Sequence, residues 1–158
     1  MIEIKAPDSR TAVVEYQIMQ PRIFLAGSIA MGMAEPWQDE IVAILRNTDA
    51  LIFNPRRDDW DSSWKQDISD ERFAEQVRWE LTHLELADKV FVYFDPNTQA
   101  PITLLELGRQ AEQGNVAAVC CPDGFWRKGN VQIICDVYGI KLLENKEDFY
   151  AEIKRQCS

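Results

Sequence analysis

The sequence is poor in the residues from which metal and redox sites are built. It contains one histidine and four cysteines in 158 residues, and no two cysteines have the Cys-x-x-Cys spacing. A zinc site made of cysteine and histidine is therefore not expected. Cys120 and Cys121 are neighbours on a predicted strand and should point to opposite faces. We interpret the four thiols as buried or half-buried groups of a reducing compartment, and we expect no metal and no cofactor.

Positive charge and long hydrophobic runs are also scarce. Lys and Arg number 17 against 26 Asp and Glu, which gives a formal net charge of −9. Such a surface repels phosphate backbones and anionic lipids, so nucleic acid and membrane are not expected partners. No apolar run approaches the roughly 20 residues that span a bilayer. The N-terminal segment is charged where a signal peptide is apolar, so we expect a cytoplasmic protein.

The apolar pattern is that of one α/β domain spanning residues 1–158. Short β-type runs alternate with longer helix-type runs, which predicts right-handed crossovers and a central parallel sheet with helices on both faces. Residues 1–20 are expected to form an N-terminal extension or to contribute an edge strand, which would span 12–18. The other strands are expected at 22–26, 50–53, 89–94, 116–120 and 141–143, and the helices at 36–47, from a cap at Ser69 to about 84, 103–113, 130–138 and 149–155.

Open sheets of this kind bind ligands beyond the carboxyl ends of their strands. The loops there begin with GSIAMG (27–32), which is neither a Walker loop nor a GxGxxG turn. A glycine after a strand lets a ligand approach the backbone, but it is also common in purely structural turns. The next loop, NPRRDDWDSSW (54–64), holds two arginines, three aspartates and two tryptophans. Its rings and carboxylates suit a nucleobase, although a surface loop whose charges pair with one another would look the same.

The third segment, DPNTQAPITLLELG (95–108), contains the candidate nucleophile Glu106. Its leucine neighbours predict a poorly hydrated carboxylate, which can attack the anomeric carbon of a sugar and hold it as an ester. The alternative is a surface glutamate favoured by the helix dipole. Glu80 lies on the preceding predicted helix, and it is either a second acid of the site or a solvated residue. His83 is expected to be a packed or surface residue rather than a catalyst.

Together these segments resemble the nucleoside 2-deoxyribosyltransferase family. The resemblance rests on IFLAGSI (23–29), FNPRRDDW (53–60), EQVRWELTHLELADKVFVYF (75–94) and PITLLELG (101–108). It implies a flavodoxin-like three-layer sandwich with a five-stranded parallel sheet. It also implies a homo-oligomer that exchanges purine or pyrimidine bases on 2-deoxyribose, with deoxynucleosides and free nucleobases as substrates.

The family's functional residues map onto specific positions of this chain. The nucleophilic glutamate falls on Glu106, and a sugar-side acid that is usually aspartate falls on Glu80. An asparagine lent by the neighbouring subunit falls on Asn130. Two positions depart from the better-known members, because Ile23 replaces a tyrosine and Ala100 replaces an acid. The expected substrate contacts are Gly27, Ser28, Asn54, Arg56, Asp59, Trp60 and Asn130.

The expected reaction is a two-step exchange with retention at the anomeric carbon. Glu106 attacks as one base leaves, and a second base then displaces the carboxylate from the same side. Glu80 either protonates the leaving base or binds the 3′-hydroxyl. Acids of the loop that could serve the base instead are Asp58, Asp59 and Asp61.

Two other functions fit the same sequence. One is an N-glycoside hydrolase of deoxynucleosides or their 5′-monophosphates, in which Arg56 and Arg57 would bind the phosphate. The other is a non-catalytic nucleotide-binding module, because a fold does not by itself imply an activity.

Overall fold

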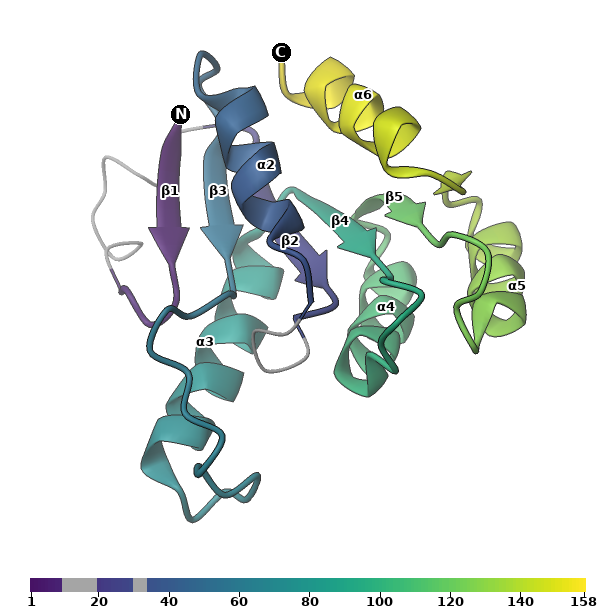
Figure 1. The fold of residues 1–158 in the computed structure, drawn as a ribbon. Helices are drawn as coiled ribbons and strands as arrows, with labels where there is room; N and C mark the ends of the chain where they lie inside the picture. Colours follow the sequence, from purple (N-terminus) through teal and green to yellow (C-terminus); the bar gives the residue numbers. More distant parts are fainter. Residues whose placement is uncertain (10–19, 30–33) are drawn as a thin grey trace.

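The computed structural model describes residues 1–9, 20–29 and 34–158 (Figure 1). The strand expected at 12–18 lies outside these ranges. The helices and strands, in chain order, are β1 (Ile2–Lys5), β2 (Arg22–Gly27), α2 (Trp37–Leu45), β3 (Leu51–Asn54), α3 (Glu71–Leu86), β4 (Lys89–Tyr93), α4 (Pro101–Gln113), β5 (Val116–Cys120), α5 (Lys128–Tyr138), β6 (Leu142–Leu143) and α6 (Lys146–Cys157).

In the described residues the sheet has six strands, all parallel, in the order β1-β3-β2-β4-β5-β6. Without β1 this is the 2-1-3-4-5 order of flavodoxin-like folds. The expectation of five strands was therefore one short, since β1 adds a strand beside β3. The missed segment, IEIK, is only four residues long and alternates with charged residues, so its apolar signal is weak.

Helices cover both faces of the sheet, and each face has its own core. One core packs α2 and α6 against the sheet through Trp37, Ile41 and Phe149. The other packs α3, α4 and α5 against the opposite face and includes Leu84 and Leu107. The three-layer α/β sandwich inferred from the sequence is thus the observed one.

The ends of the helices follow local chemistry that hydrophobic periodicity does not report. The first turn of α3 is capped by Asp70, whose side chain accepts hydrogen bonds from the backbone N–H groups of Arg72 and Phe73. The cap expected at Ser69 was wrong by one residue. Asn145 likewise caps α6, which begins several residues before the expected start because its first turn is polar.

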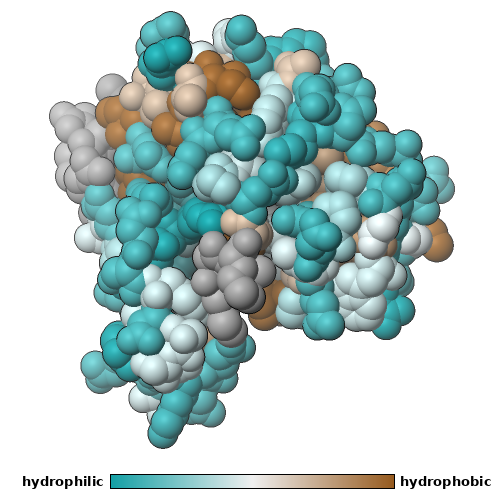
Figure 2. Space-filling view, in the orientation of Figure 1, coloured by the Kyte–Doolittle hydropathy of each residue, from teal (hydrophilic) through white to brown (hydrophobic). Residues whose placement is uncertain are grey.

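The four cysteines are all free and buried. Burial raises the pKa of the Cys121 and Cys135 thiols to about 11, so both are inert at neutral pH. Among the described residues, no helix combines the length and the apolar character needed to cross a bilayer. Most of the face seen in Figure 2 is hydrophilic, in keeping with the excess of charged residues.

Candidate active site

The switch point of the sheet lies between β2 and β4, whose carboxyl ends are adjacent. Gly27 pairs with Tyr93 at the ends of the two strands. Just beyond, the hydroxyl of Ser28 lies 2.7 Å from that of Thr98 and accepts a hydrogen bond of 3.0 Å from the backbone N–H of Asp95. Ligands of open α/β sheets bind at this point, so these residues mark the floor of the candidate site.

Packing of the strand end requires a glycine at position 27. A Cβ atom there would lie 2.4 Å from the carbonyl oxygen of Tyr93 and 2.8 Å from a ring carbon of Trp37. No side chain fits at such distances. The structural alternative considered for Gly27 therefore accounts for the residue without a ligand.

Glu106 lies in the second turn of α4, on the side that faces the protein. Thr103, Leu107 and Gln110, which precede or follow it at helical spacing, are buried, whereas Leu105 on the outer side is 71% exposed. The residue as a whole is half-buried. Its carboxyl group is nevertheless withdrawn from solvent, and this desolvation raises its pKa.

The backbone entering α4 is strained. Ala100 adopts the left-handed conformation, with φ of 45° and ψ of 51°, directly before Pro101 at the first helical position. For a residue with a Cβ this conformation costs about 1 kcal/mol. No side chain caps the helix, so its first N–H groups point toward the carboxyl edge of the sheet without a side-chain partner. Such strain is often concentrated at functional sites.

Glu80 is the second desolvated acid and projects from the middle of α3. Its Oε1 accepts a hydrogen bond of 2.8 Å from Nε2 of Gln76, one turn earlier in the helix. The same nitrogen donates to the carbonyl oxygen of Pro55, at 2.9 Å, just after β3. Burial raises the pKa of Glu80, and the bond from Gln76 opposes that rise.

The two acids are electrostatically coupled. The charge of Glu80 is the second cause, after burial, of the raised pKa of Glu106. Arg109 acts in the opposite direction, but its guanidinium is bound to Glu85 at 2.6 Å. Because burial raises the pKa of both groups, the pair retains one proton at pH values where an ordinary glutamate has lost it.

The loop after β3 begins with residues that bind other parts of the chain. The side chain of Asn54 donates to Oε1 of Glu3 at 2.7 Å and accepts from the backbone N–H of Arg56 at 3.0 Å. The Arg56 guanidinium donates to the carbonyl oxygens of Ala34, at 2.8 Å, and Glu35, at 3.1 Å. Both residues thus lie at the carboxyl edge, with their polar groups engaged by the protein.

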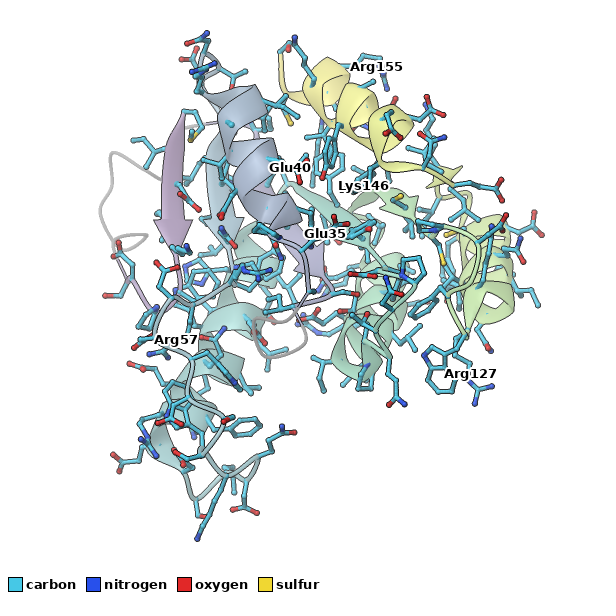
Figure 3. All side chains as sticks on the ribbon, in the orientation of Figure 1. Glu35, Glu40, Arg57, Arg127, Lys146 and Arg155 are labelled. Carbon is cyan, nitrogen blue, oxygen red and sulfur yellow. The ribbon has the colours of Figure 1, made fainter. Side chains whose placement is uncertain are left out.

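The remainder of the loop is also largely self-contained. Arg57 forms ion pairs with Asp59, at 2.8 Å, and with Glu75, at 3.5 Å, and lies 4.8 Å from the ring centre of Trp64. Trp60 packs against Trp64 with ring centres 4.9 Å apart. Figure 3 shows Arg57 at the start of the segment that extends with α3 beyond the sheet. This arrangement matches the alternative in which the loop charges pair with one another.

Strand β1 ties this loop and α3 to the sheet. Besides Glu3, which binds Asn54, Lys5 forms an ion pair with Asp58 at 2.6 Å. The indole N–H of Trp79 in α3 donates to the carbonyl oxygen of Asp8 at 2.7 Å. The N-terminal segment therefore braces both the loop and the helix that bears Glu80.

His83 is packed in the core, as the sequence indicated. Its ring lies between Trp79, at 3.8 Å between ring centres, and Phe53, at 4.9 Å, and its Nδ1 is 2.7 Å from the carbonyl oxygen of Trp79. Burial lowers the pKa of the imidazole, which favours its neutral form.

A second acid at the carboxyl edge, Glu35, belongs to the opposite face of the sheet. It accepts hydrogen bonds from the hydroxyl of Tyr93, at 2.7 Å, and from Nζ of Lys146, at 2.8 Å, and Figure 3 shows Glu35 and Lys146 close together. The bond from Lys146 is the main reason that the pKa of Glu35 is lowered. Sequence reasoning missed this network, because Lys146 is 111 residues away from Glu35 in the chain.

Asn130 lies in the first turn of α5. It is exposed and borders a groove of about 310 Å³ between α4 and α5. The residues that line this groove are Leu104, Leu107, Gly108, Arg127, Asn130, Val131 and Ile134. Neither Glu80 nor Glu106 lines it, although Leu107, the neighbour of Glu106 in α4, does.

Sequence reasoning also missed Gln76, which bonds Glu80 directly. A glutamine inside a charged helix ordinarily indicates a solvated face, but this one is only 4% exposed. Its i to i+4 spacing from Glu80 was the available signal. In the part of the chain that the structure describes, no cluster of three or more His, Cys, Asp or Glu side chains suits a metal ion.

The chain is thus a doubly wound α/β protein with a pair of coupled, desolvated carboxyl groups on helices α3 and α4. The family model described as nucleoside 2-deoxyribosyltransferase like matches residues 20–125, and the chain belongs to that family. A crystal structure of a conserved protein from Enterococcus faecalis V583 has the same fold, with a TM-score of 0.60 and 14% identity over 85% of this chain and 97% of that chain. No curated protein matches the sequence.

Proposed function

We propose that the protein transfers the 2-deoxyribosyl group between nucleobases through a covalent ester on Glu106. The observation that carries the proposal is the pair of coupled, desolvated carboxyl groups formed by Glu80 and Glu106. One proton held by two carboxyls provides both an acid and a nucleophile, which are the two groups that glycosidic exchange requires. Membership of the family supports the same class of reaction.

In the first step a carboxylate oxygen of Glu106 forms a bond to C1′ while the C1′–N bond breaks. The bonding electron pair leaves with the base, and the proton of the pair passes to it. In the second step a nitrogen of the incoming base attacks C1′ and the ester bond breaks, which restores the carboxylate and returns a proton to the pair. Two displacements give overall retention of configuration.

Glu80 is the group that best fits the acid/base role. The three aspartates considered as alternatives are exposed, and each is engaged elsewhere. Asp58 pairs with Lys5, Asp59 pairs with Arg57, and Asp61 accepts the backbone N–H of Ser63 at 2.8 Å. Their surroundings lower the pKa of Asp59 and Asp61, so these two are ionised at neutral pH and carry no proton to donate.

The engagement of Arg56 and Arg57 favours nucleosides over 5′-monophosphates as substrates. Arg56 is bound to two backbone carbonyl groups and Arg57 to two carboxylates. A phosphate would have to displace these partners before either guanidinium bound it bidentately. We therefore include an unphosphorylated deoxynucleoside and a free nucleobase in the proposal.

We also propose a homo-oligomer in which Asn130 serves the site of a neighbouring subunit. Its exposed position on the α4–α5 groove, which neither acid of its own chain lines, supports this role. Mixing Glu106→Gln subunits with Asn130→Ala subunits tests it. Hybrid oligomers should recover activity that neither variant has alone, whereas an additive mixture would contradict shared sites.

Intact mass after mixing with a deoxynucleoside is the direct test of covalent catalysis. The protein should gain one deoxyribosyl unit, and peptide mapping should locate it on Glu106. The Glu106→Gln variant should gain none while keeping its fold. If wild-type protein binds the nucleoside without a mass change, a non-catalytic binding module explains the fold better.

Product analysis separates the transferase from a hydrolase that uses the same glutamate. With deoxyuridine and adenine present, a transferase forms deoxyadenosine, whereas a hydrolase releases free deoxyribose at a rate that does not depend on the acceptor. The four free, buried thiols agree with a reducing compartment, and we propose that the enzyme works in the cytoplasm.

A further inference from the structure

Gln76 uses one nitrogen to connect the loop after β3 with the acid pair. Its Nε2 donates to the carbonyl oxygen of Pro55, at 2.9 Å, and to Oε1 of Glu80, at 2.8 Å. An amide nitrogen has two hydrogens, so both are committed. The side chain is 4% exposed. Water therefore does not compete for either bond.

The orientation of this amide is set by its partners. Turning it over would place its oxygen against a carbonyl oxygen and a carboxylate, both of which only accept hydrogen bonds while Glu80 is ionised. The amide oxygen of Gln76 is buried without a hydrogen-bond partner in the described structure. An unpaired buried acceptor destabilises the folded state, and a methionine of similar size would have no such acceptor. The arrangement thus sacrifices stability to keep the two donors in place.

We propose that Gln76 is a positioning residue, which fixes the Glu80 carboxylate by anchoring it to the backbone of the β3 loop. The proposal rests on the proposed function, since the reaction gives Glu80 its role. With Oε1 of Glu80 held by the amide, the other carboxylate oxygen is the one left for proton exchange with Glu106 and the substrate. Gln76 does not touch the reacting atoms.

The same bond determines how the acid pair shares its proton. A donor to a carboxylate stabilises the ionised form, so Gln76 opposes the effect of burial on the pKa of Glu80. The charged groups that act on the pair from α4 are Glu106 itself and Arg109, which is bound to Glu85 of α3. The bond from Gln76 thus favours the ionised form of Glu80, and its loss should shift the shared proton toward Glu80.

Two substitutions at this position separate positioning from structural support. Gln76→Met keeps the length and removes both donors together with the unpaired acceptor. It should leave the protein folded, while kcat falls by about 100-fold and KM changes little, because a misplaced acid slows the chemical step. The acidic limb of the kcat/KM profile should move to higher pH. Gln76→Glu replaces the donor by a second acid and should move that limb further in the same direction.

Gln38→Met is a matched control. Gln38 is fully buried in α2, and neither of its polar side-chain atoms has a hydrogen-bond partner in the described structure. The same chemical change there removes no hydrogen bond. It should leave kcat and the pH profile as they are in the wild type.

Titration of the glutamate side chains by carbon-13 NMR gives a readout that does not need activity. The Glu80 carboxyl should ionise at higher pH in Gln76→Met than in wild type. If wild-type protein forms no deoxyribosyl adduct, the proposed function fails, but this titration still tests the tie between Gln76 and Glu80. The positioning role is overturned if Gln76→Met keeps the wild-type titration and pH profile, or if both Gln76 variants lose their fold.

Discussion

Two acid clusters lie at the same edge of the sheet and have opposite electrostatics. On the α2–α6 face, Glu35 is paired with Lys146 and Tyr93, and its pKa is lowered. On the α3–α4 face, burial raises the pKa of both Glu80 and Glu106, and the charge of Glu80 raises that of Glu106 further. The difference shows that the partner, rather than the residue type or the strand end, decides whether a carboxylate supports the fold or is available for chemistry.

Glu106→Gln is expected to have the largest effect. It removes the nucleophile, so transfer should fall by roughly 10⁴-fold or more, with no deoxyribosyl adduct. Because the pKa of folded Glu106 is raised above its unfolded value, ionisation destabilises the fold as pH rises through that range. At about pH 8 the free energy of unfolding of the variant should therefore exceed that of the wild type by about 1–2 kcal/mol. This gain should vanish near pH 4. Equal melting at both pH values would show that the carboxyl is well hydrated.

Glu80→Gln tests the coupling between the two acids. Loss of the acid should reduce turnover by about 10²–10⁴-fold. Loss of its charge should also lower the pKa of Glu106, although burial still holds that pKa above the value of an ordinary glutamate. The pH at which base release begins should therefore move down. Single-turnover release of the base, followed as a function of pH, measures this shift. A midpoint that stays in place would mean that the two carboxyls do not interact.

Glu35→Gln is the counterpart on the opposite face. It removes an ion pair that is partly exposed, so the expected loss of stability is at most about 1 kcal/mol. Since the pKa of folded Glu35 lies below its unfolded value, this loss should be present at neutral pH and disappear as pH falls through the folded value. Denaturant unfolding at pH 7 and pH 3 measures it. Adduct formation on Glu106 should persist, and its absence would mean that the two clusters act as one site.

Ala100→Gly should produce the smallest change and separates backbone strain from charge. Glycine relieves the left-handed conformation but loses more entropy on folding, which leaves a net gain of about 0.5 kcal/mol. The matched change Ala111→Gly, within the same helix, should destabilise by about 1 kcal/mol. The midpoints of urea unfolding give both values. A loss of stability at position 100 would show that the strain is held by contacts of the alanine methyl group.

The sequence allowed the layers of the fold to be predicted, because buried strands such as 89–93 are almost uninterrupted apolar runs. It did not reveal β1, a strand of four residues in which apolar and charged side chains alternate. This strand is ordered by its pairing with β3. The two glutamates could be proposed from the chain order and the family resemblance. The partners of Arg56 could not, since they are backbone carbonyl groups 21 and 22 residues away, which leave no trace in the identity of any side chain.

The bracing by β1 bears on how this protein can be engineered. Strand β1 and the residues after it hold Asn54, Asp58 and Trp79, and through them the loop after β3 and helix α3, which carries both Gln76 and Glu80. Deleting residues 1–9 would spare the flavodoxin-like order of the remaining strands. Catalysis should then decay before the fold does, so affinity handles are better placed at the opposite terminus, where Ser158 is exposed.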